Sequence, residues 1–551
     1  MTTAIHSQAF DDLAARVLDE RWQVYPHEAA SSGLHEYDGR LPVVSQQAID
    51  TRVAQLRSTL AEAEAIDGAT LFDQQRFDLA LLTNGVRHEL LELTELRQYR
   101  RDPQAHLYPI DVSNYMDRDY APVGQRLEAV ARLLRGVPAY LDAARGLLAP
   151  PFAKPVLSAG IEAWQGMAGF YGDDLAMFAE QHATGALAQE LADARNAAIS
   201  SLNAFVDYLK SQQATANDDF ALGAEHYAAM LRYGEMVDVP LADIEAAGER
   251  ELARLDEIAG DAAERIALGQ DVHSAVSTVS KEHPTADRLL DDTRAMLEEI
   301  RTFVVDRDIA SVISEVRPTV RETPAFMRWA FAAMSGPGPF EQVATESFYY
   351  VTPVDPQWTP EQAEEWLSNF NYANLKMISV HEVYPGHYVH FLRHHNAPSP
   401  ISKVFGAYSF WEGWAHYCEE MMLEQGYGVG DPMLQLAMAH EALIRLCRLM
   451  CSLRMHTRGM TLAEAKSFFQ EHAYMEELPA SKEAQRGTFD PGYLNYTLGK
   501  LMIYKLRADV QREQGSAFSL KAFHDELLSH GGPPVPLLRG IMLRHDDGKV
   551  L

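Results

Sequence analysis

Apolar residues recur at helical spacing along almost the whole of this 551-residue chain. Proline and glycine punctuate the pattern, and neither an internal repeat nor a low-complexity tract is evident. Apolar positions three and four residues apart form one face of a helix, so the pattern predicts a mainly α fold. The clearest predicted helices are residues 8–25, 45–64, 70–96, 123–147, 154–170, 174–212, 221–235, 241–260, 286–306 and 360–370.

One segment departs from the helical pattern. Residues 347–353 read Ser-Phe-Tyr-Tyr-Val-Thr-Pro and follow a Gly- and Pro-rich loop, residues 335–339. β-Branched and aromatic residues between turn signals predict a strand. The polar stretch 213–220 predicts a boundary between an N-terminal helical lobe, residues 1–215, and a second lobe, residues 216–551, packed around one channel.

The second lobe carries the most specific motif, His381-Glu382-Val-Tyr-Pro385-Gly386-His387. A hydrolytic zinc site uses three protein ligands and leaves the fourth position to water, whose pKa falls to about 7. Histidines four residues apart share a helical face, but a spacing of six turns the second ring by about 600°, away from the first. Proline clashes with the preceding helical turn, and glycine permits unusual backbone angles. We therefore predict a helix break that brings His387 back to His381, with Glu382 as the general base.

A second predicted helix, residues 409–423, carries the candidate third ligand. Glu412 follows His387 by 25 residues and lies at the start of this helix. The helix is predicted to pack on the first one and to present Glu412 to the same zinc ion. Glu419 lies two turns further along the same face and is predicted to hold a ligand histidine in its metal-binding tautomer. His416 shares that face.

Two other interpretations stay open at this point. A His-Glu pair is commonly a surface or core pair, and a Pro-Gly step commonly ends a helix, although their conjunction with Glu412 is unexpected by chance. His390 and His394 have the spacing of a helical metal clamp without any break. No glutamate follows His390 to serve as a base, so we favour His381 and His387.

Several motifs together resemble a known bacterial family. They are His381-Glu-x-x-Pro-Gly-His387, Glu412-Gly-Trp-Ala-x-Tyr417, Pro491-Gly492 with Tyr496-x-x-Gly499, Gly223-Ala-Glu-x-Tyr227 and the N-terminal stretch 26–41. They are similar to the bacterial domain-of-unknown-function family number eight hundred and eighty-five, and the resemblance covers nearly the whole chain. It implies a mostly helical, gluzincin-like zinc hydrolase with a bilobal, helical-metallopeptidase-like architecture and a small sheet beside the metal helix.

The resemblance also implies roles around the metal. In gluzincin-like enzymes an edge strand before the metal helix binds the substrate backbone, which would place Tyr349 or Tyr350 in the cleft, while packing in the core is the alternative. Tyr496 would stabilise the oxyanion unless it only packs at a helix start, and His456 would donate to the same oxygen or cap a helix. Arg486 would bind a substrate carboxylate, although a surface salt bridge is the common fate of an arginine.

Three positions differ from the family pattern. His390 and Tyr493 stand where the family tends to have glutamine, and Ser452 stands where it commonly has aspartate. The metal ligands are unaffected. We expect these changes to alter the shape and polarity of the substrate pocket.

Composition limits the partners and the location. Lys and Arg total 48 against 78 Asp and Glu, a net charge of −30, which argues against nucleic acid or an anionic membrane as a partner. The three cysteines, Cys418, Cys447 and Cys451, lie in helical segments and predict unpaired buried thiols. Neither a signal-peptide pattern nor a membrane-spanning apolar window is evident, so we expect a cytoplasmic protein.

The sequence therefore predicts a hydrolase that uses one zinc ion to cleave peptide bonds in short peptides. One rival prediction is a non-catalytic helical scaffold or binding protein with a vestigial metal site. Another is a zinc amidase that acts on non-peptide substrates, because the same residues attack either kind of bond. The oligomeric state is left open.

Overall fold

The computed structural model describes residues 2–269, 271–324, 328 and 331–551. About 71% of the chain is helical and 3% is strand, which confirms the predicted mainly α fold with one small sheet. The chain divides into two compact units, one formed by the chain up to Phe220 together with Pro337–Thr345, the other by Ala221–Gly336 and Glu346–Leu551. The sequence had assigned residues 337–345 to the second lobe, whereas they belong to the first unit.

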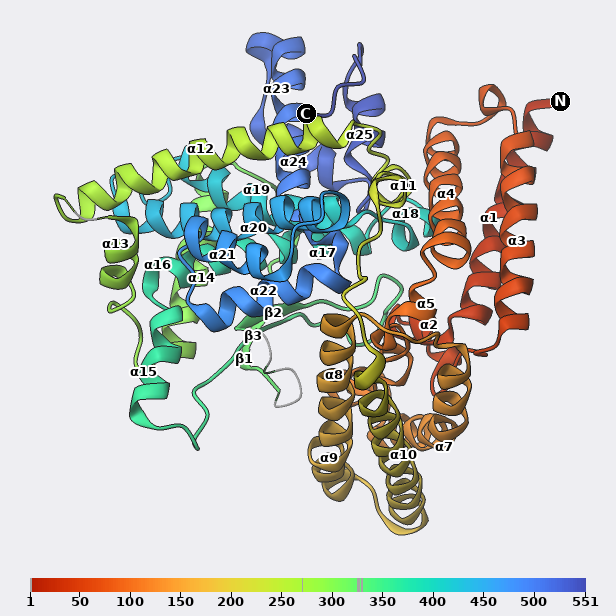
Figure 1. The fold of residues 1–551 in the computed structure, drawn as a ribbon. Coiled ribbons are helices and arrows are strands. Elements are labelled where there is room, and N and C mark those ends of the chain that lie inside the picture. The colour runs from red at the N-terminus through yellow and green to blue at the C-terminus, as the bar shows by residue number, and fades with distance from the viewer. Residues whose placement is uncertain (1, 270, 325–327, 329–330) are drawn as a thin grey trace. The chain divides into compact units, whose positions relative to one another are not determined.

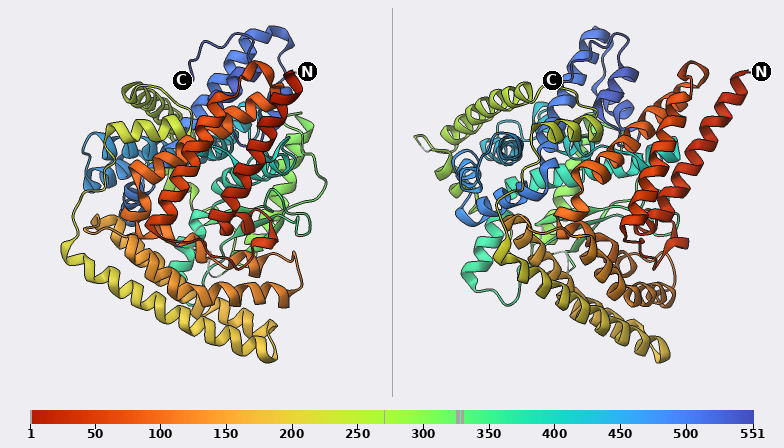
Figure 2. Two further views of the ribbon diagram at one scale, coloured as in Figure 1. Left: turned by 90° about the vertical axis from the view of Figure 1, so that its right-hand side faces the viewer. Right: turned by 45° about the vertical axis from the view of Figure 1, so that its right-hand side comes forward.

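The first unit is built from ten α-helices in its described residues (Figure 1). Within it, α10 packs along α7 and α8, and α3 packs on α4, as both views in Figure 2 also show. The helices are α1 (Thr2–Val24), α2 (Pro26–Ser31), α3 (Gln46–Ala65), α4 (Asp73–Leu91), α5 (Gln98–Arg101), α6 (Ser113–Asp117), α7 (Val123–Leu147), α8 (Lys154–Gly172), α9 (Asp174–His182) and α10 (Gly185–Gln212).

Helix α7 has the bounds that the sequence predicted, but the single helix predicted over residues 174–212 is two helices. The helix is interrupted between α9 and α10, where Ala183 and Thr184 have extended backbone angles and Gly185 has a φ of +60°. A left-handed backbone angle is readily adopted only by glycine, so this residue permits the turn. Helical periodicity on both sides of a short break conceals it in the sequence.

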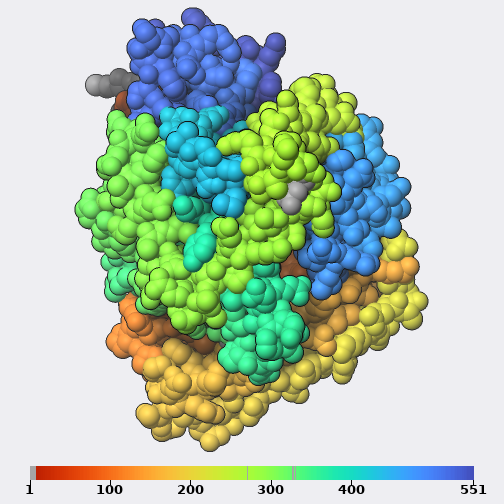
Figure 3. Space-filling view, turned by 90° about the vertical axis from the view of Figure 1, so that its left-hand side faces the viewer, coloured from red at the N-terminus to blue at the C-terminus, as the bar shows by residue number. Residues whose placement is uncertain are grey.

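The second unit contains the sheet and the remaining helices. They are α11 (Ala224–Gly234), α12 (Leu241–Ile266), α13 (Val272–Val279), α14 (Leu289–Asp306), α15 (Pro360–Asn369), α16 (Tyr372–Glu382), α17 (His387–His395), α18 (Pro400–Val404), α19 (Tyr408–Glu424), α20 (Pro432–Thr457), α21 (Leu462–His472), α22 (Glu477–Phe489), α23 (Asn495–Gln514), α24 (Leu520–Leu528) and α25 (Val535–Met542). In Figure 3 the yellow-green residues, which include α12, lie on the surface of this unit beside blue residues from the last third of the chain.

Helix α19 forms the centre of the second unit. It packs against α23 on one side and against α16 on another, while α12 packs along α20. The apolar residues that predicted this helix are fully buried: Phe410, Trp414, Tyr417, Met421 and Met422. Helix α21 begins with a reciprocal capping box between Thr461 and Glu464. Cys418, Cys447 and Cys451 are buried and unpaired, as predicted.

In the described residues the sheet has three strands, in the order β1-β3-β2. Strand β3 (Phe348–Val351) pairs in parallel with β1 (Thr319–Glu322) and antiparallel with β2 (Ala332–Ser335). The predicted strand is therefore confirmed, but it is the central strand and not the edge strand that we expected. Its neighbour β2 is the edge strand that contacts the helix carrying His381. The sequence signal of β2 is weak because it reads Ala-Ala-Met-Ser, with no β-branched or aromatic residue.

No helix in the described part of the chain combines the length and the apolar character needed to cross a membrane.

Candidate metal centre

The metal centre is built on the predicted helix break. Helix α16 ends at Glu382 and α17 begins at His387, so the interruption is confirmed. Gly386 donates its backbone N–H to the carbonyl of Val380 at 3.1 Å. A Cβ atom at position 386 would lie only 1.7 Å from the carbonyl oxygen of His381, so only glycine lets the chain return this closely to the end of α16.

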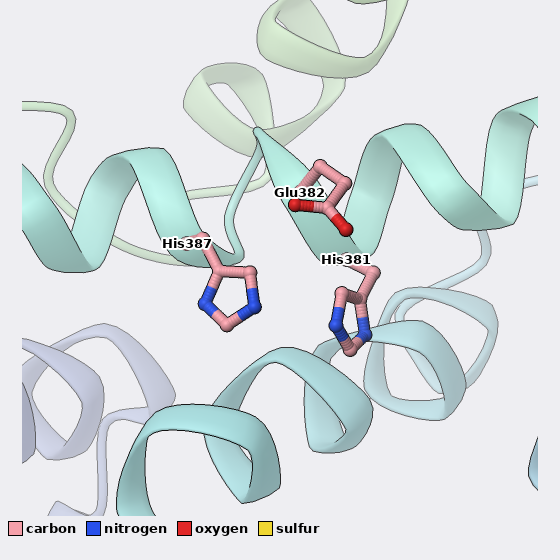
Figure 4. A group of neighbouring side chains, drawn as sticks. All are labelled: His381, Glu382 and His387. Carbon is pink, nitrogen blue, oxygen red and sulfur yellow. The ribbon is translucent and has the colours of Figure 1, made fainter. Parts of the chain in front are cut away.

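The returning chain brings two imidazoles and one carboxylate together. Nε2 of His381 and Nε2 of His387 each lie 3.5 Å from Oε2 of Glu412. Ligands bound tetrahedrally to zinc at 2.0–2.1 Å lie about 3.3 to 3.4 Å from one another, so these separations fit a shared ion closely. Figure 4 shows the rings of His381 and His387 turned to the same side of the break.

Glu382 lies beside this trio. Ligand atoms of His381, Glu382 and His387 are all within 4.8 Å of one another, so proximity alone would also allow Glu382 as the third ligand. However, Oε2 of Glu382 accepts the backbone N–H of Met334 in β2 at 3.0 Å, whereas Oε2 of Glu412 is equally distant from both imidazoles. This geometry favours Glu412 as the ligand and leaves Glu382 as a neighbouring, oriented carboxylate.

Glu419 binds the ring nitrogen of His381 that faces away from Glu412. Nδ1 of His381 lies 2.6 Å from Oε1 of Glu419, so the ring donates its Nδ1 proton and directs Nε2 toward Glu412. Glu419 is almost fully buried, and Arg445 at 3.3 Å and His416 at 3.2 Å approach its two oxygens. Burial by itself would raise the pKa of Glu419, but Arg445 and the two histidines hold it well below its usual range. Glu419 thus contacts His381 through one oxygen and His416 through the other.

The cluster is charged even without a cation. Burial lowers the pKa of His381, but hydrogen bonds to Glu412 and Glu419 outweigh it and raise that pKa to about 9. Burial raises the pKa of Glu412, yet His387 and His381 hold it far below its usual range. The carboxylates therefore favour a positive charge between the imidazoles, and a bound divalent cation would supply it in place of an imidazole proton. The donor set of two imidazoles and one carboxylate suits zinc.

Tyr496 stands beside the metal ligands because two glycines let α19 and α23 pack closely. A Cβ atom at Gly499 would lie 1.9 Å from the carbonyl oxygen of Ser409, and one at Gly413 would lie 2.5 Å from Cα of Gly499. The ring of Tyr496 is nearly parallel to that of His381, with centroids 6.5 Å apart. Tyr496 therefore lies on α23, and α23 packs against α19, the helix that carries Glu412.

Arg486 reaches the neighbourhood of Tyr496 but already has an anionic partner. Its Nε and Nη2 lie 3.0 and 2.9 Å from Oδ2 of Asp490, and Nη2 donates to the hydroxyl of Tyr408 at 3.2 Å. The ring of Tyr408 in turn meets that of Tyr496 edge-on. Arg486 thus lies near Tyr496 and forms an ion pair with Asp490.

Comparison with known proteins assigns the family. The model of a bacterial protein family of unknown function, DUF885, matches residues 26–542. The chain belongs to this family. No curated protein matches it.

Two solved structures share the fold of this DUF885 protein. A candidate lipoprotein of unknown function from Shewanella oneidensis has a TM-score of 0.82 at 24% sequence identity, over 97% of this chain and 100% of the other. A candidate lipoprotein from Colwellia psychrerythraea has a TM-score of 0.81 at 17% identity, over 98% of both chains. At these identities the likeness concerns the fold alone.

Other residues that the sequence singled out are not brought into the cluster. In the DUF885 chain His456 is buried, accepts the backbone N–H of Leu222 through Nδ1 at 3.3 Å, and lies with Nε2 2.7 Å from the carbonyl of Gly487. Both ring nitrogens therefore bind backbone groups, which indicates a structural role for His456. His390 is fully buried against Trp411, with its ring centroid 4.0 Å away, and Nε2 lies 2.9 Å from the carbonyl of Gly531.

The tyrosines expected in the cleft lie in the interior. Tyr349 and Tyr350 on the central strand are 0% and 1% exposed. The hydroxyl of Tyr349 lies 3.3 Å from Oγ of Ser379, so Tyr349 contacts α16, the helix that carries His381. Their burial follows from the central position of β3, because both faces of that strand are covered.

Three neighbours of the site were missed from the sequence. Met334 supplies the backbone N–H to Glu382, Arg445 holds Glu419, and Arg448 lies over the ring of Tyr496 at 5.0 Å from its centroid. A backbone donor carries no residue-specific signal. The two arginines sit three residues apart on α20, and this spacing places them on one helical face, but nothing in the sequence says what that face meets.

Proposed function

We propose that this DUF885 protein is a zinc-dependent hydrolase that cleaves peptide bonds in short peptides. The observation that carries the proposal is the equal 3.5 Å separation of Glu412 Oε2 from Nε2 of His381 and of His387. A further carboxylate, Glu382, lies next to the two histidines, and a purely structural zinc site does not require such a group. Bound zinc would supply a Lewis acid that lowers the pKa of a water ligand and polarises a carbonyl group.

Glu382 is the proposed general base. It takes a proton from the attacking water and later gives it to the leaving amine. The N–H of Met334 holds one of its oxygens at 3.0 Å, which fixes the direction of the carboxylate. Tyr496 is the proposed donor to the carbonyl oxygen as that oxygen gains negative charge, because its ring lies next to His381.

A peptide substrate has a backbone edge to pair with. Among the described residues, strand β2 has only β3 as a neighbour in the sheet, and its Met334 turns its N–H toward Glu382 and not toward β3. We place the substrate backbone along this outer edge of β2, in the manner of strand addition. We thus assign substrate binding to β2 and not to β3, the strand expected from the sequence.

The decisive experiment separates a base from a ligand. Glu382→Gln should retain one zinc per chain, measured by elemental analysis, and lose about 10²- to 10⁴-fold in turnover on a peptide library. Glu365→Gln, on the exposed face of α15, is the matched control and should behave as the unmodified protein. Full turnover in Glu382→Gln would remove the assigned base. Bound zinc without hydrolysis of any peptide or simple amide would support the non-catalytic scaffold, and cleavage of amides alone would support the amidase.

We keep the cytoplasm as the proposed location. The relatives from Shewanella oneidensis and Colwellia psychrerythraea are described as candidate lipoproteins, and that description belongs to those proteins. Cell fractionation tests the proposal, because recovery in the membrane fraction would overturn it.

A further inference from the structure

The chain that orients Glu382 continues directly into the first unit. Met334 in β2 donates its N–H to Glu382, and three residues later Pro337 begins the segment Pro337–Thr345, which belongs to the first unit. We call this stretch the anchored segment. Strand β2 is four residues long, and within the part of the chain that the structure describes it pairs with β3 alone, so the position of its C-terminal end affects where the Met334 N–H lies.

The anchored segment is held by backbone and ring contacts within the first unit. The N–H of Phe340 donates to the carbonyl of Ser32 at 2.9 Å, and its ring meets that of Trp22 edge-on at 6.3 Å. The fit is close enough to need a glycine on the opposite chain. A Cβ atom at Gly33 would lie 2.4 Å from the backbone nitrogen of Glu341.

A charged group adds to this fit. Glu341 is 4% exposed, and its Oε2 lies 2.8 Å from Nε2 of His35, while Oε1 accepts the N–H groups of Val343 and Ala344 at 2.7 and 3.2 Å. One carboxylate thus both folds the anchored segment and binds it to the N-terminal chain. Hydrogen bonds to an ionised carboxylate are stronger than neutral ones.

His35 is itself fixed from the other side. Its Nδ1 lies 3.3 Å from Oδ1 of Asp38, and its ring stacks on Tyr120 with centroids 3.5 Å apart. The hydroxyl of Tyr120 donates to Oδ2 of Asp38 at 2.7 Å. His35, Asp38 and Glu341 therefore form a clasp whose central imidazole sits between two carboxylates. The run Gly33-Leu-His35-Glu-Tyr-Asp38 is part of the N-terminal motif to which the metal site gives no role.

We propose that His35 and Glu341 are positioning residues for Glu382. The clasp fixes the end of β2, and β2 keeps the Met334 N–H on the carboxylate of the general base. This inference rests on the proposed function in so far as Glu382 is the base, but the anchoring of β2 can be measured without any substrate.

The test compares Glu341→Ala, which removes the clasp and the N–H acceptor together, with His35→Gln, which leaves Glu341 and its bonds to Val343 and Ala344 in place. Glu341→Gln is the conservative variant that retains an acceptor oxygen. Glu36→Ala removes an equal charge from an exposed neighbour of His35 and is the matched control. Amide hydrogen exchange of residues 332–335, zinc content, kcat and KM are measured for the full chain.

We expect Glu341→Ala to speed exchange at residues 332–335 and to lower kcat by about ten- to a hundredfold, with KM changed by less than about threefold and zinc retained. His35→Gln should show the same pattern to a smaller degree, and Glu341→Gln should recover most of kcat. A general loss of stability would not spare KM and zinc in this way.

Exchange and kcat equal to those of Glu36→Ala in both Glu341→Ala and His35→Gln would overturn the proposal, and so would faster exchange with unchanged kcat. If Glu341→Ala fails to fold, His35→Gln decides alone. If the unmodified protein cleaves nothing, the proposed function fails separately, and exchange at residues 332–335 then decides whether the clasp holds β2.

Discussion

Two histidine pairs follow one another along α16 and α17 and have opposite surroundings. His390 and His394 have the spacing that suits a straight helix, yet both pack against Trp411, and burial lowers the pKa of His394 to about 4. His381 and His387 have a spacing that a straight helix cannot use, yet they share Glu412. Buried imidazoles packed on an indole ring stay neutral, whereas those facing carboxylates attract a cation. Whether two histidines can bind a metal ion therefore depends more on the helix break and the nearby charges than on their spacing in the sequence.

The largest difference should come from substituting one histidine of each pair. His387→Ala should lose bound zinc and turnover together, because it removes one of three ligands. His394→Gln should keep zinc and change turnover by no more than about twofold, as a substitution outside the site does. Zinc content and activity measured side by side check both outcomes. Zinc loss in His394→Gln with retention in His387→Ala would reverse our assignment.

The helix break itself can be tested at Gly386. Gly386→Ala should lower the free energy of unfolding by about 3 kcal/mol or more and weaken zinc binding, because a Cβ atom would lie 1.7 Å from the carbonyl oxygen of His381. Gly260→Ala in α12 is the control, since its Cβ meets nothing within 4 Å, and alanine should stabilise that helix by up to about 1 kcal/mol. Thermal unfolding with and without a chelator separates folding from metal binding. Equal stabilities would contradict the strict need for glycine.

The carboxylate behind His381 should matter less than the ligands. Glu419→Gln should weaken zinc binding by about 10- to 100-fold, because a neutral amide then replaces the charged acceptor of the Nδ1 proton of His381. Glu424→Gln, exposed at the end of the same helix, should leave the affinity unchanged. Competition with a fluorescent zinc chelator measures both. An unaltered affinity in Glu419→Gln would remove its role in orienting His381.

The smallest effect is expected at Arg486. Because Asp490 already binds its Nε and Nη2, we expect free and amidated peptide ends to differ by less than about tenfold in kcat/KM. Rates on matched peptide pairs, in the unmodified protein and in Arg486→Ala, give the answer. A hundredfold preference for the free end that disappears in Arg486→Ala would show that Arg486 exchanges Asp490 for the substrate carboxylate.

Much of the site followed from the sequence because its signals are local. The Pro-Gly insertion predicted the break, and the apolar face of residues 409–423 predicted a buried helix. The positions of Glu412 and Glu419 on that helix predicted a third ligand and a carboxylate that holds one of the ligand histidines. The strand at residues 347–353 was visible from its aromatic and β-branched residues. Its place in the sheet was not, because β2 lacks such residues and strand order depends on pairing between segments distant in the chain.

The sequence by itself determined the helical class, the candidate ligands and the need for a break between His381 and His387, because each depends on neighbouring residues and backbone sterics. Only the tertiary structure decided that β2 is the edge strand beside the metal helix, that Met334 orients Glu382, and that His456 and Arg486 already have partners. It also decided that residues 337–345 belong to the first unit, where Glu341 binds His35 across more than 300 positions of the chain. Contacts between such distant segments arise from packing and charge pairing, which no local pattern encodes.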